Sequence, residues 1–231
     1  MEEGPSLRDK IVDKLKQKAT LKQRVSDNTQ TVFRNLKSVL HELAAELDET
    51  LEEMNNLDDT IKVEYRDRGH FEAQFQVAED ILIFNMQSDV FEFERNHPLW
   101  QNPYVVANGD NSYCGVINIY NFLADSFKYN RNSDEGYLIA RIFVNSDMQY
   151  FVEGKNQKGV TCDKFGTAEI DKKALLGIAE TAVDYALTFD LLVPNYESVK
   201  LVNVQQFNTK VDNSRTKTGK RLGYVFSTDD I

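Results

Sequence analysis

The residues best suited to covalent chemistry lie near the middle of this 231-residue chain, where Cys114 follows His97 and Asp110. A cysteine thiolate becomes a nucleophile when a histidine within hydrogen-bond reach takes its proton. His70 is a second candidate for that base. No spacing among these residues establishes such reach, and Cys114 opens an apolar stretch, as a core thiol does. A small Cys/His-dependent hydrolase or transferase is therefore the alternative interpretation, and a protein without catalytic residues is favoured.

A second group of polar residues could bind an anion. The segment 210–221 places five basic side chains among serine, threonine and glycine, and charge-assisted hydrogen bonds from such a loop hold phosphates or carboxylates. It is not a nucleotide-hydrolase loop, because the earlier glycine is missing and no Ser or Thr follows the lysine. A ligand-sensing domain for a small anion and a solvated hairpin loop are both open interpretations of these residues: Lys210, Arg215, Lys217, Lys220 and Arg221.

Metal and disulfide chemistry find little support in the sequence. The three histidines, His41, His70 and His97, show no ligand spacing with one another or with a cysteine. The two cysteines, Cys114 and Cys162, form neither a CxxC pair nor a dense disulfide framework. The sequence therefore predicts no metal site, no cofactor and reduced, buried thiols.

Composition and charge limit the classes of partner. With 41% hydrophobic residues, the chain has enough apolar material for a core. Its formal charge of −10 argues against general affinity for nucleic acids or anionic membranes, which are bound through Lys and Arg. No run reaches the roughly 18 apolar residues of a membrane span, and the first residues lack an apolar signal core. We expect a soluble, cytoplasmic protein.

The elements that must position these residues begin with a helical segment over about residues 6–57. Ser6 and Asp9 form a shortened capping box, and Ser26 to Asn28 offers caps for a second helix start. Apolar residues then recur at three- and four-residue steps, which places one ribbon along a helix. This ribbon either packs on the chain's own domain or forms a seam with a second copy, through Leu36, Leu43, Leu47 and Leu51.

Charge is sorted along the same segment, with lysine and arginine in its front half and glutamate and aspartate in its rear half. Two antiparallel helices would set these blocks side by side. The pattern therefore predicts either a helical hairpin or an antiparallel or staggered pairing between two copies. A membrane-surface helix is disfavoured because Ile11 and Leu15 offer too little apolar area.

From residue 60 the apolar period changes to two, which is typical of strands. A meander of three strands is expected first, and Pro98 and Pro103 then predict an irregular loop over 96–111. Asp171 is the expected N-cap of a long helix with an alanine-rich apolar face. Further strands complete an α+β fold in which this helix covers a mainly antiparallel sheet. The predicted strands are 61–66, 71–77, 81–86, 90–93, 113–122, 137–145, 149–152, 199–207 and 222–226.

Two parts follow from these patterns: a helical segment at 1–58 and an α+β domain at 59–231. Because no catalytic motif is present, the favoured function is a non-enzymatic assembly or adaptor protein. Its helical segment would self-associate or dock on a protein partner, and its sheet domain would bind a partner or ligand.

Overall fold

The computed structural model describes residues 6–54, 61–132, 134–154, 157, 159–188, 200–201 and 204–205. Seven strands form one antiparallel sheet in the order β1-β2-β3-β5-β6-β7, and β4 pairs with β5 at one end. A long N-terminal helix and a second helix after the last strand lie against it, so the α+β prediction is confirmed. The two final predicted strands fall largely or wholly outside the described residues.

The helices and strands that the sequence predicts within the described residues begin and end within a few residues of their predicted bounds. The α-helices are α1 (Leu7–Glu53), α2 (Pro103–Ala107), α3 (Ala124–Lys128) and α4 (Lys172–Leu187). The strands are β1 (Val63–Asp67), β2 (Glu72–Val77), β3 (Asp80–Met86), β4 (Phe91–Glu92), β5 (Tyr113–Leu123), β6 (Tyr137–Asn145) and β7 (Tyr150–Gly154). Three 3-10 turns are η1 (Pro98–Gln101), η2 (Gly109–Ser112) and η3 (Cys162–Lys164).

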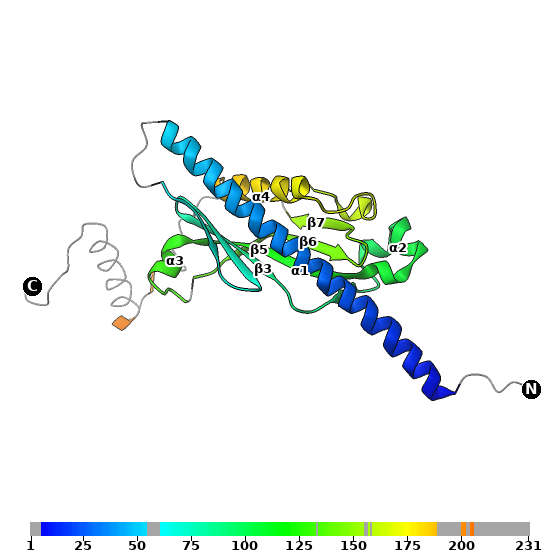
Figure 1. Cartoon of the computed structure of the whole chain (residues 1–231). Coiled ribbons are helices and arrows are strands. Elements are labelled where there is room, and N and C mark those ends of the chain that lie inside the picture. The colour runs from blue at the N-terminus through cyan, green and yellow to red at the C-terminus, as the bar shows by residue number, and fades with distance from the viewer. Residues whose placement is uncertain are drawn as a thin grey trace, which may run out of the picture.

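Helix α1 begins at the predicted capping box. The Ser6 hydroxyl accepts a hydrogen bond from the Asp9 backbone N–H at 3.2 Å, and the Asp9 carboxylate accepts one from the Ser6 N–H at 3.0 Å. The expected second start near residue 26 is wrong, because α1 is one continuous helix of 47 residues. A helical hairpin is therefore excluded over these residues. Figure 1 shows α1 running across the sheet, with its N-terminal end projecting beyond it.

Tertiary contacts explain why the polar stretch at residues 26–29 does not end α1. The Asn28 side-chain amide donates to the carbonyls of Asn145 and Ser146 at 3.0 and 2.8 Å, in the turn between β6 and β7. The Thr29 hydroxyl donates to the Val25 carbonyl one turn earlier. These side chains find partners within the helical conformation, so they do not compete with it as caps.

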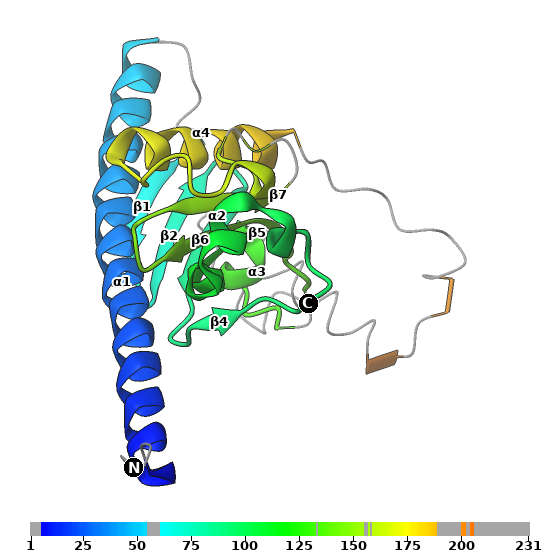
Figure 2. The same ribbon diagram turned by 90° about the vertical axis from the view of Figure 1, so that its right-hand side faces the viewer.

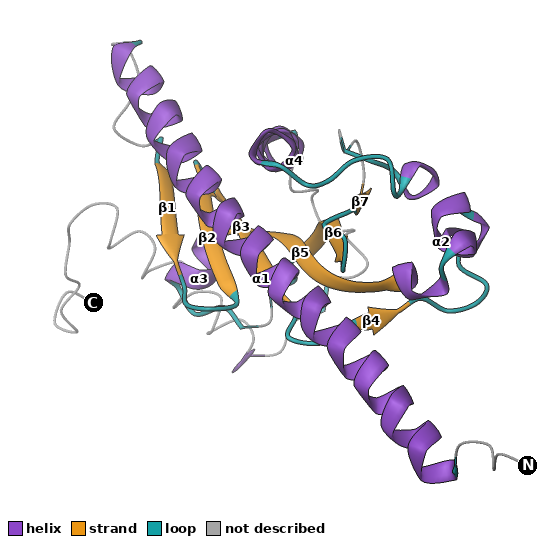
Figure 3. Cartoon of the chain, turned by 45° about the vertical axis from the view of Figure 1, so that its right-hand side comes forward, coloured by secondary structure: helices purple, strands orange, loops and turns teal. Residues whose placement is uncertain are grey.

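One face of the sheet is covered by α1 and α4, which also contact each other (Figure 3). The buried core on this face combines both helices with residues from five strands, and partly buried residues of β1 pack against it. Leu36 and Leu43 belong to it with exposed fractions of 0% and 5%, and Leu47 packs against it. These leucines therefore face the chain's own sheet, and Leu36 and Leu43 are not free to form an interface. The helical segment and the domain divided near residue 58 share one core.

Close approach between α1 and the sheet depends on Gly115 in β5. A Cβ at this position would lie 2.0 Å from the Thr29 hydroxyl and 2.8 Å from its Cβ, so any larger residue would push the helix away. Helix α4 starts at the predicted cap, where the Asp171 carboxylate accepts from the Ala174 N–H at 2.7 Å. Its alanines Ala179 and Ala182 are fully buried, as expected for a helix close to a sheet.

The opposite face is covered by shorter segments, with α2 and α3 on the side of the sheet away from α1 (Figure 2). A second, smaller core there joins the loop 96–112 to β5, β6 and β7. The loop expected to be irregular forms helical turns, because Pro98 and Pro103 occupy first-turn positions where a missing N–H costs nothing. His97 and Asn102 cap these two turns.

Candidate functional site

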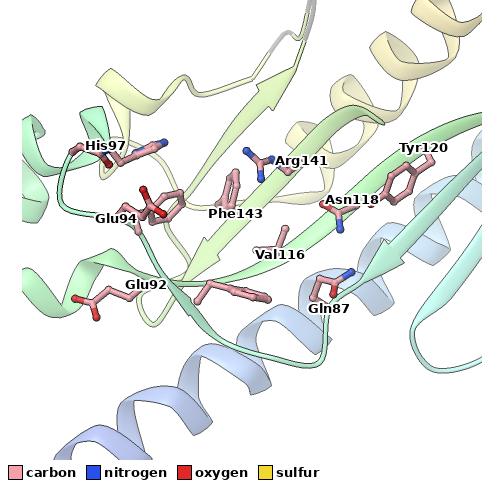
Figure 4. Close-up of a pocket in the computed structure, with 12 residues that line it drawn as sticks. Gln87, Glu92, Glu94, His97, Val116, Asn118, Tyr120, Arg141 and Phe143 are labelled. Atoms are coloured by element: carbon pink, nitrogen blue, oxygen red, sulfur yellow. The ribbon is translucent and has the colours of Figure 1, made fainter. Parts of the chain in front are cut away.

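A groove of about 680 Å³ opens on the second face of the sheet, between strands β5 and β6 and the segment that carries β4 (Figure 4). Its volume lies within the roughly 300–1,000 Å³ of small-molecule sites. The lining combines aromatic and apolar side chains with amides and charged groups. These residues are Gln87, Phe91, Glu92, Phe93, Glu94, Asn96, His97, Val116, Asn118, Tyr120, Arg141 and Phe143.

The segment over the groove is fixed at several points. Phe91 and Glu92 pair with Cys114 and Tyr113 of β5 as strand β4. The Phe93 ring packs on Phe143, with ring centroids 5.0 Å apart, and its carbonyl accepts a hydrogen bond from the Trp100 indole at 3.2 Å. The loop around Trp100 therefore holds one wall of the groove.

A polar row crosses the sheet beneath the groove. The strand register aligns Asn85 of β3 with Asn118 of β5, Asn118 with Arg141 of β6, and Arg141 with Glu153 of β7. Paired residues of antiparallel strands point to the same face, so the four side chains form one line. Apolar residues occupy the corresponding positions on the other face, among them Ile117. The row is thus confined to the groove side.

One end of this row is a connected charge pair. The Arg141 guanidinium donates to Glu153 at 2.5 Å, and the other Glu153 oxygen lies 3.3 Å from His97 Nε2. His97 Nδ1 accepts the Leu99 backbone N–H at 3.2 Å, so that nitrogen carries no proton. The neutral ring therefore holds its proton on Nε2 and donates it to Glu153. This chain of contacts fixes the direction of Arg141.

The middle of the row lacks such partners. Asn118 is only 8% exposed, yet its side-chain amide forms no hydrogen bond to any of the described residues. Its neighbour Asn85 differs, because the Gln87 amide donates to the Asn85 oxygen at 2.7 Å. The Asn118 polar atoms are not among the buried unpaired atoms of the described part of the chain, so they are open to solvent in the groove, where another molecule could pair with them.

The predicted catalytic residues do not form a catalytic group. Cys114 is fully buried in the second core, and burial raises the pKa of its thiol, with a smaller contribution from Cys162. A thiolate is therefore disfavoured at that position. Both ring nitrogens of His97 are already engaged, and Asp110 is exposed in η2. These contacts weigh against the hydrolase or transferase alternative.

The anion-binding loop predicted from the sequence lies outside the described part of the chain. The anion-binding residues Lys210, Arg215, Lys217, Lys220 and Arg221 fall outside the described residues. Across the ranges that the structure describes, no group of three or more His, Cys, Asp or Glu side chains is placed to hold a metal ion. No helix within the same ranges is long and apolar enough to cross a membrane.

A second candidate surface is the N-terminal end of α1, where residues 6–20 are all exposed. Lysines at four-residue steps form one ridge along the helix, and apolar residues at the same steps form a ridge beside it. Leu7 and Leu15 in this apolar ridge are 76% and 64% exposed. The ridges are Lys10, Lys14, Lys18 and Lys22, and Leu7, Ile11 and Leu15.

The rear end of α1 has the opposite charge. Six acidic residues and no basic ones lie between residues 42 and 53: Glu42, Glu46, Asp48, Glu49, Glu52 and Glu53. Lys10 and Glu46 are separated by 36 residues. At 3.6 residues per turn, these two side chains leave the helix in nearly the same direction. Lys10 and Glu46 therefore face one side of the helix, whereas Glu42 is paired with Lys172 of α4 at 2.7 Å.

In comparisons with known proteins, the chain matches no family model, no curated protein and no solved structure. Its function is therefore inferred from geometry and charge alone.

Both candidate surfaces were only partly visible in the sequence. The charge sorting of α1 is readable in the sequence. Ile11 and Leu15 offer too little apolar area to predict a membrane-surface helix, and their exposure beside the lysine ridge is known only from the structure. Asn118 has one signal in the sequence, an amide between two isoleucines of a strand that also contains Asn121. Its place beside Arg141 required the register of four strands, and short polar insertions in strands do not specify register.

Proposed function

We propose that this protein is a non-enzymatic assembly protein that pairs two copies through the opposite charges at the two ends of α1. The observation that carries the proposal is the opposite charge of the two ends of one continuous helix, with Lys10 and Glu46 on the same side of it. Laid antiparallel, two α1 helices would set each basic end against the acidic end of the other. Such a contact is isologous and closes as a dimer.

Helix stability does not account for these charges. The last turn of α1 contains Glu52 and Glu53 and no basic residue, although a helix C-terminus favours cations. Lys10, Lys14 and Lys18 repel one another at four-residue spacing, each pair costing about 0.2–0.5 kcal/mol. Both the acidic last turn and the spacing of the lysines destabilise an isolated helix. A partner of complementary charge would explain both.

A second copy of the chain is the occupant that fits. Between residues 6 and 24, seven basic and two acidic side chains give a net charge of +5. The whole chain nevertheless carries −10, so the rest of the molecule is more acidic still. The exposed Leu7 and Leu15 would add apolar contact to this attraction. Free cysteines and acidic charge agree with the reducing cytoplasm, the compartment we propose.

A charge-swap experiment tests the dimer. Lys10→Glu with Lys14→Glu, and separately Glu46→Lys with Glu49→Lys, should each weaken association by at least about 10-fold in sedimentation equilibrium at low salt. Combining all four substitutions restores the pairing and should recover most of the affinity. The melting temperature serves as the folding control, because Lys10, Lys14, Glu46 and Glu49 are all exposed and form no ion pair in the described part of the chain.

Several results would overturn the proposal. A wild-type chain that stays monomeric at every concentration contradicts self-association, and a dimer indifferent to both charge reversals contradicts the α1 contact. Binding to anionic lipid vesicles that is lost in the Lys10→Glu, Lys14→Glu chain would assign the basic end to membranes instead. Deleting α1 is not a usable test, because Phe33, Leu36 and Leu40 belong to the core.

A further inference from the structure

The groove on the second face points to a function separate from assembly. We propose that it binds a small neutral molecule whose planar aromatic ring carries an amide-type edge, meaning a hydrogen-bond donor beside an acceptor. Nucleobase-like heterocycles and aryl carboxamides share this chemistry. The proposal rests on the groove and the Asn118 row, and it does not depend on the dimer.

Asn118 defines the hydrogen-bonding edge of the ligand. Its carboxamide presents two N–H donors and one carbonyl acceptor, and the side chain is 8% exposed, without a partner among the described residues. The complement of such a group is another donor and acceptor side by side, which pairs with it through two hydrogen bonds. Asn and Gln recognise adenine in this bidentate way.

Neighbouring side chains make Asn118 the open position of the row. On one side, the Asn85 oxygen already accepts from Gln87. On the other, the Arg141 guanidinium is held by Glu153, which also meets His97. A ligand at Asn118 would therefore enter a line of side chains whose orientations are already fixed.

The charges around the groove favour a neutral ligand over an anion. Glu153 balances the charge of Arg141 at 2.5 Å, so Arg141 is not a free cation. Glu94 lines the groove, is exposed, and forms no ion pair in the described part of the chain. Its carboxylate would repel a phosphate or carboxylate nearby.

The apolar part of the groove fits an aromatic ring. Val116 and Phe143 lie beside Asn118 and Arg141 on neighbouring strands, and Phe91 lines the wall provided by β4 (Figure 4). Phe91 is 43% exposed, so covering it would remove apolar surface from water. Base-sized rings gain stability by stacking on such side chains.

Four fragments test the class of ligand. Benzamide and adenine carry the proposed edge, benzoate is the anionic counterpart of benzamide, and N,N-dimethylbenzamide keeps the ring but has no N–H donor. Protein NMR titration of the full chain should show benzamide or adenine binding with a Kd on the order of 1 mM, with shifts at Asn118 and Val116. Whichever of benzamide and adenine binds more tightly shows whether an aryl carboxamide or a nucleobase-like ring supplies the donor and acceptor. Benzoate and the dimethyl compound should bind at least about 10-fold more weakly.

Matched variants distinguish hydrogen bonding between Asn118 and the ligand from nonspecific binding. Asn118→Leu keeps the size of the side chain and removes both hydrogen-bonding functions, so it should weaken benzamide or adenine at least about 10-fold. Asn35→Leu, on the exposed side of α1, should change nothing. Should Asn118→Leu fold poorly, Phe91→Ala removes a ring that is 43% exposed on the groove wall and should weaken the same binding about 3-fold or more.

Three outcomes would overturn the inference. Benzoate binding as tightly as benzamide would make the groove an anion site. Equal binding of the dimethyl compound would leave no role for the edge, and shifts that survive both groove variants would place the fragment elsewhere. Dimer formation is measured on the same samples, so a failure here leaves the assembly proposal standing.

Discussion

The two faces of the sheet are covered by different means. On the first face, α1 and α4 lay apolar side chains on apolar strands, and the core residues there are almost completely buried. On the second face, short turns and β4 cover only part of the sheet and leave a polar row beneath a groove. The difference indicates that the first face provides most of the stability, which leaves residues of the second face free for binding.

The largest expected loss of stability comes from a substitution in the core of the first face. Phe33 of α1 is 1% exposed, so Phe33→Ala should cost about 3–5 kcal/mol of unfolding free energy by leaving a cavity. Phe91→Ala on the second face removes a ring that is 43% exposed and should cost less than about 1 kcal/mol. Urea denaturation of both variants measures the difference, and equal losses would contradict the contrast between the faces.

A smaller loss should come from overpacking the contact between α1 and β5. Gly115→Ala would place its Cβ 2.0 Å from the Thr29 hydroxyl, and we expect a loss of about 1–3 kcal/mol. Adding Thr29→Ala removes the nearest atom and should recover part of that loss, as a double-mutant cycle would show. Gly177→Ala in α4 is the control, since nothing lies within 4 Å of its added Cβ. Strict additivity in the cycle would mean that Thr29 is not the obstacle.

A gain of less than about 1 kcal/mol is expected from Asp80→Asn at neutral pH. Burial raises the pKa of the Asp80 carboxyl, with Glu79 adding to the effect and the hydrogen bond from Asn121 opposing it. Ionisation of Asp80 therefore opposes folding. The cost is present above the folded-state pKa and disappears below the unfolded one, where the carboxyl is protonated in both states.

The asparagine also supplies a donor to the buried Asn121 oxygen, which has no partner in the described structure. Thermal melts across this acidic range should show the advantage of Asp80→Asn growing as the pH rises. A constant difference from low to neutral pH would show that charge is not its cause.

The smallest effect tests whether the polar row stabilises the fold. Glu153→Gln weakens the contacts to Arg141 and His97, but the Arg141 side chain is 44% exposed, so a loss of only about 0.5–1 kcal/mol is expected. The loss should shrink further in high salt. Glu52→Gln, at the exposed end of α1, is the control and should not destabilise. A loss above about 3 kcal/mol would make the row part of the core.

Local signals predicted most of the fold, because caps and periodicity act over a few residues. The capping box at Ser6, the cap at Asp171 and the alternation in β1 and β2 each depend on neighbours in the chain. The continuity of α1 through Asn28 was not predictable, since it depends on carbonyls that lie 117 and 118 residues away. The groove was not predictable for the same reason, because its row of side chains forms only when four strands pair.

Strand β5 connects the two surfaces proposed for function. Gly115 touches α1 from one face of the strand, while Val116 and Asn118 line the groove on the other. A shift of α1 on forming the proposed dimer would therefore act on a strand that also lines the groove proposed for the ligand. Thermodynamic linkage makes such coupling reciprocal: a ligand that binds the dimer tenfold more tightly strengthens the dimer by the same factor for each ligand bound.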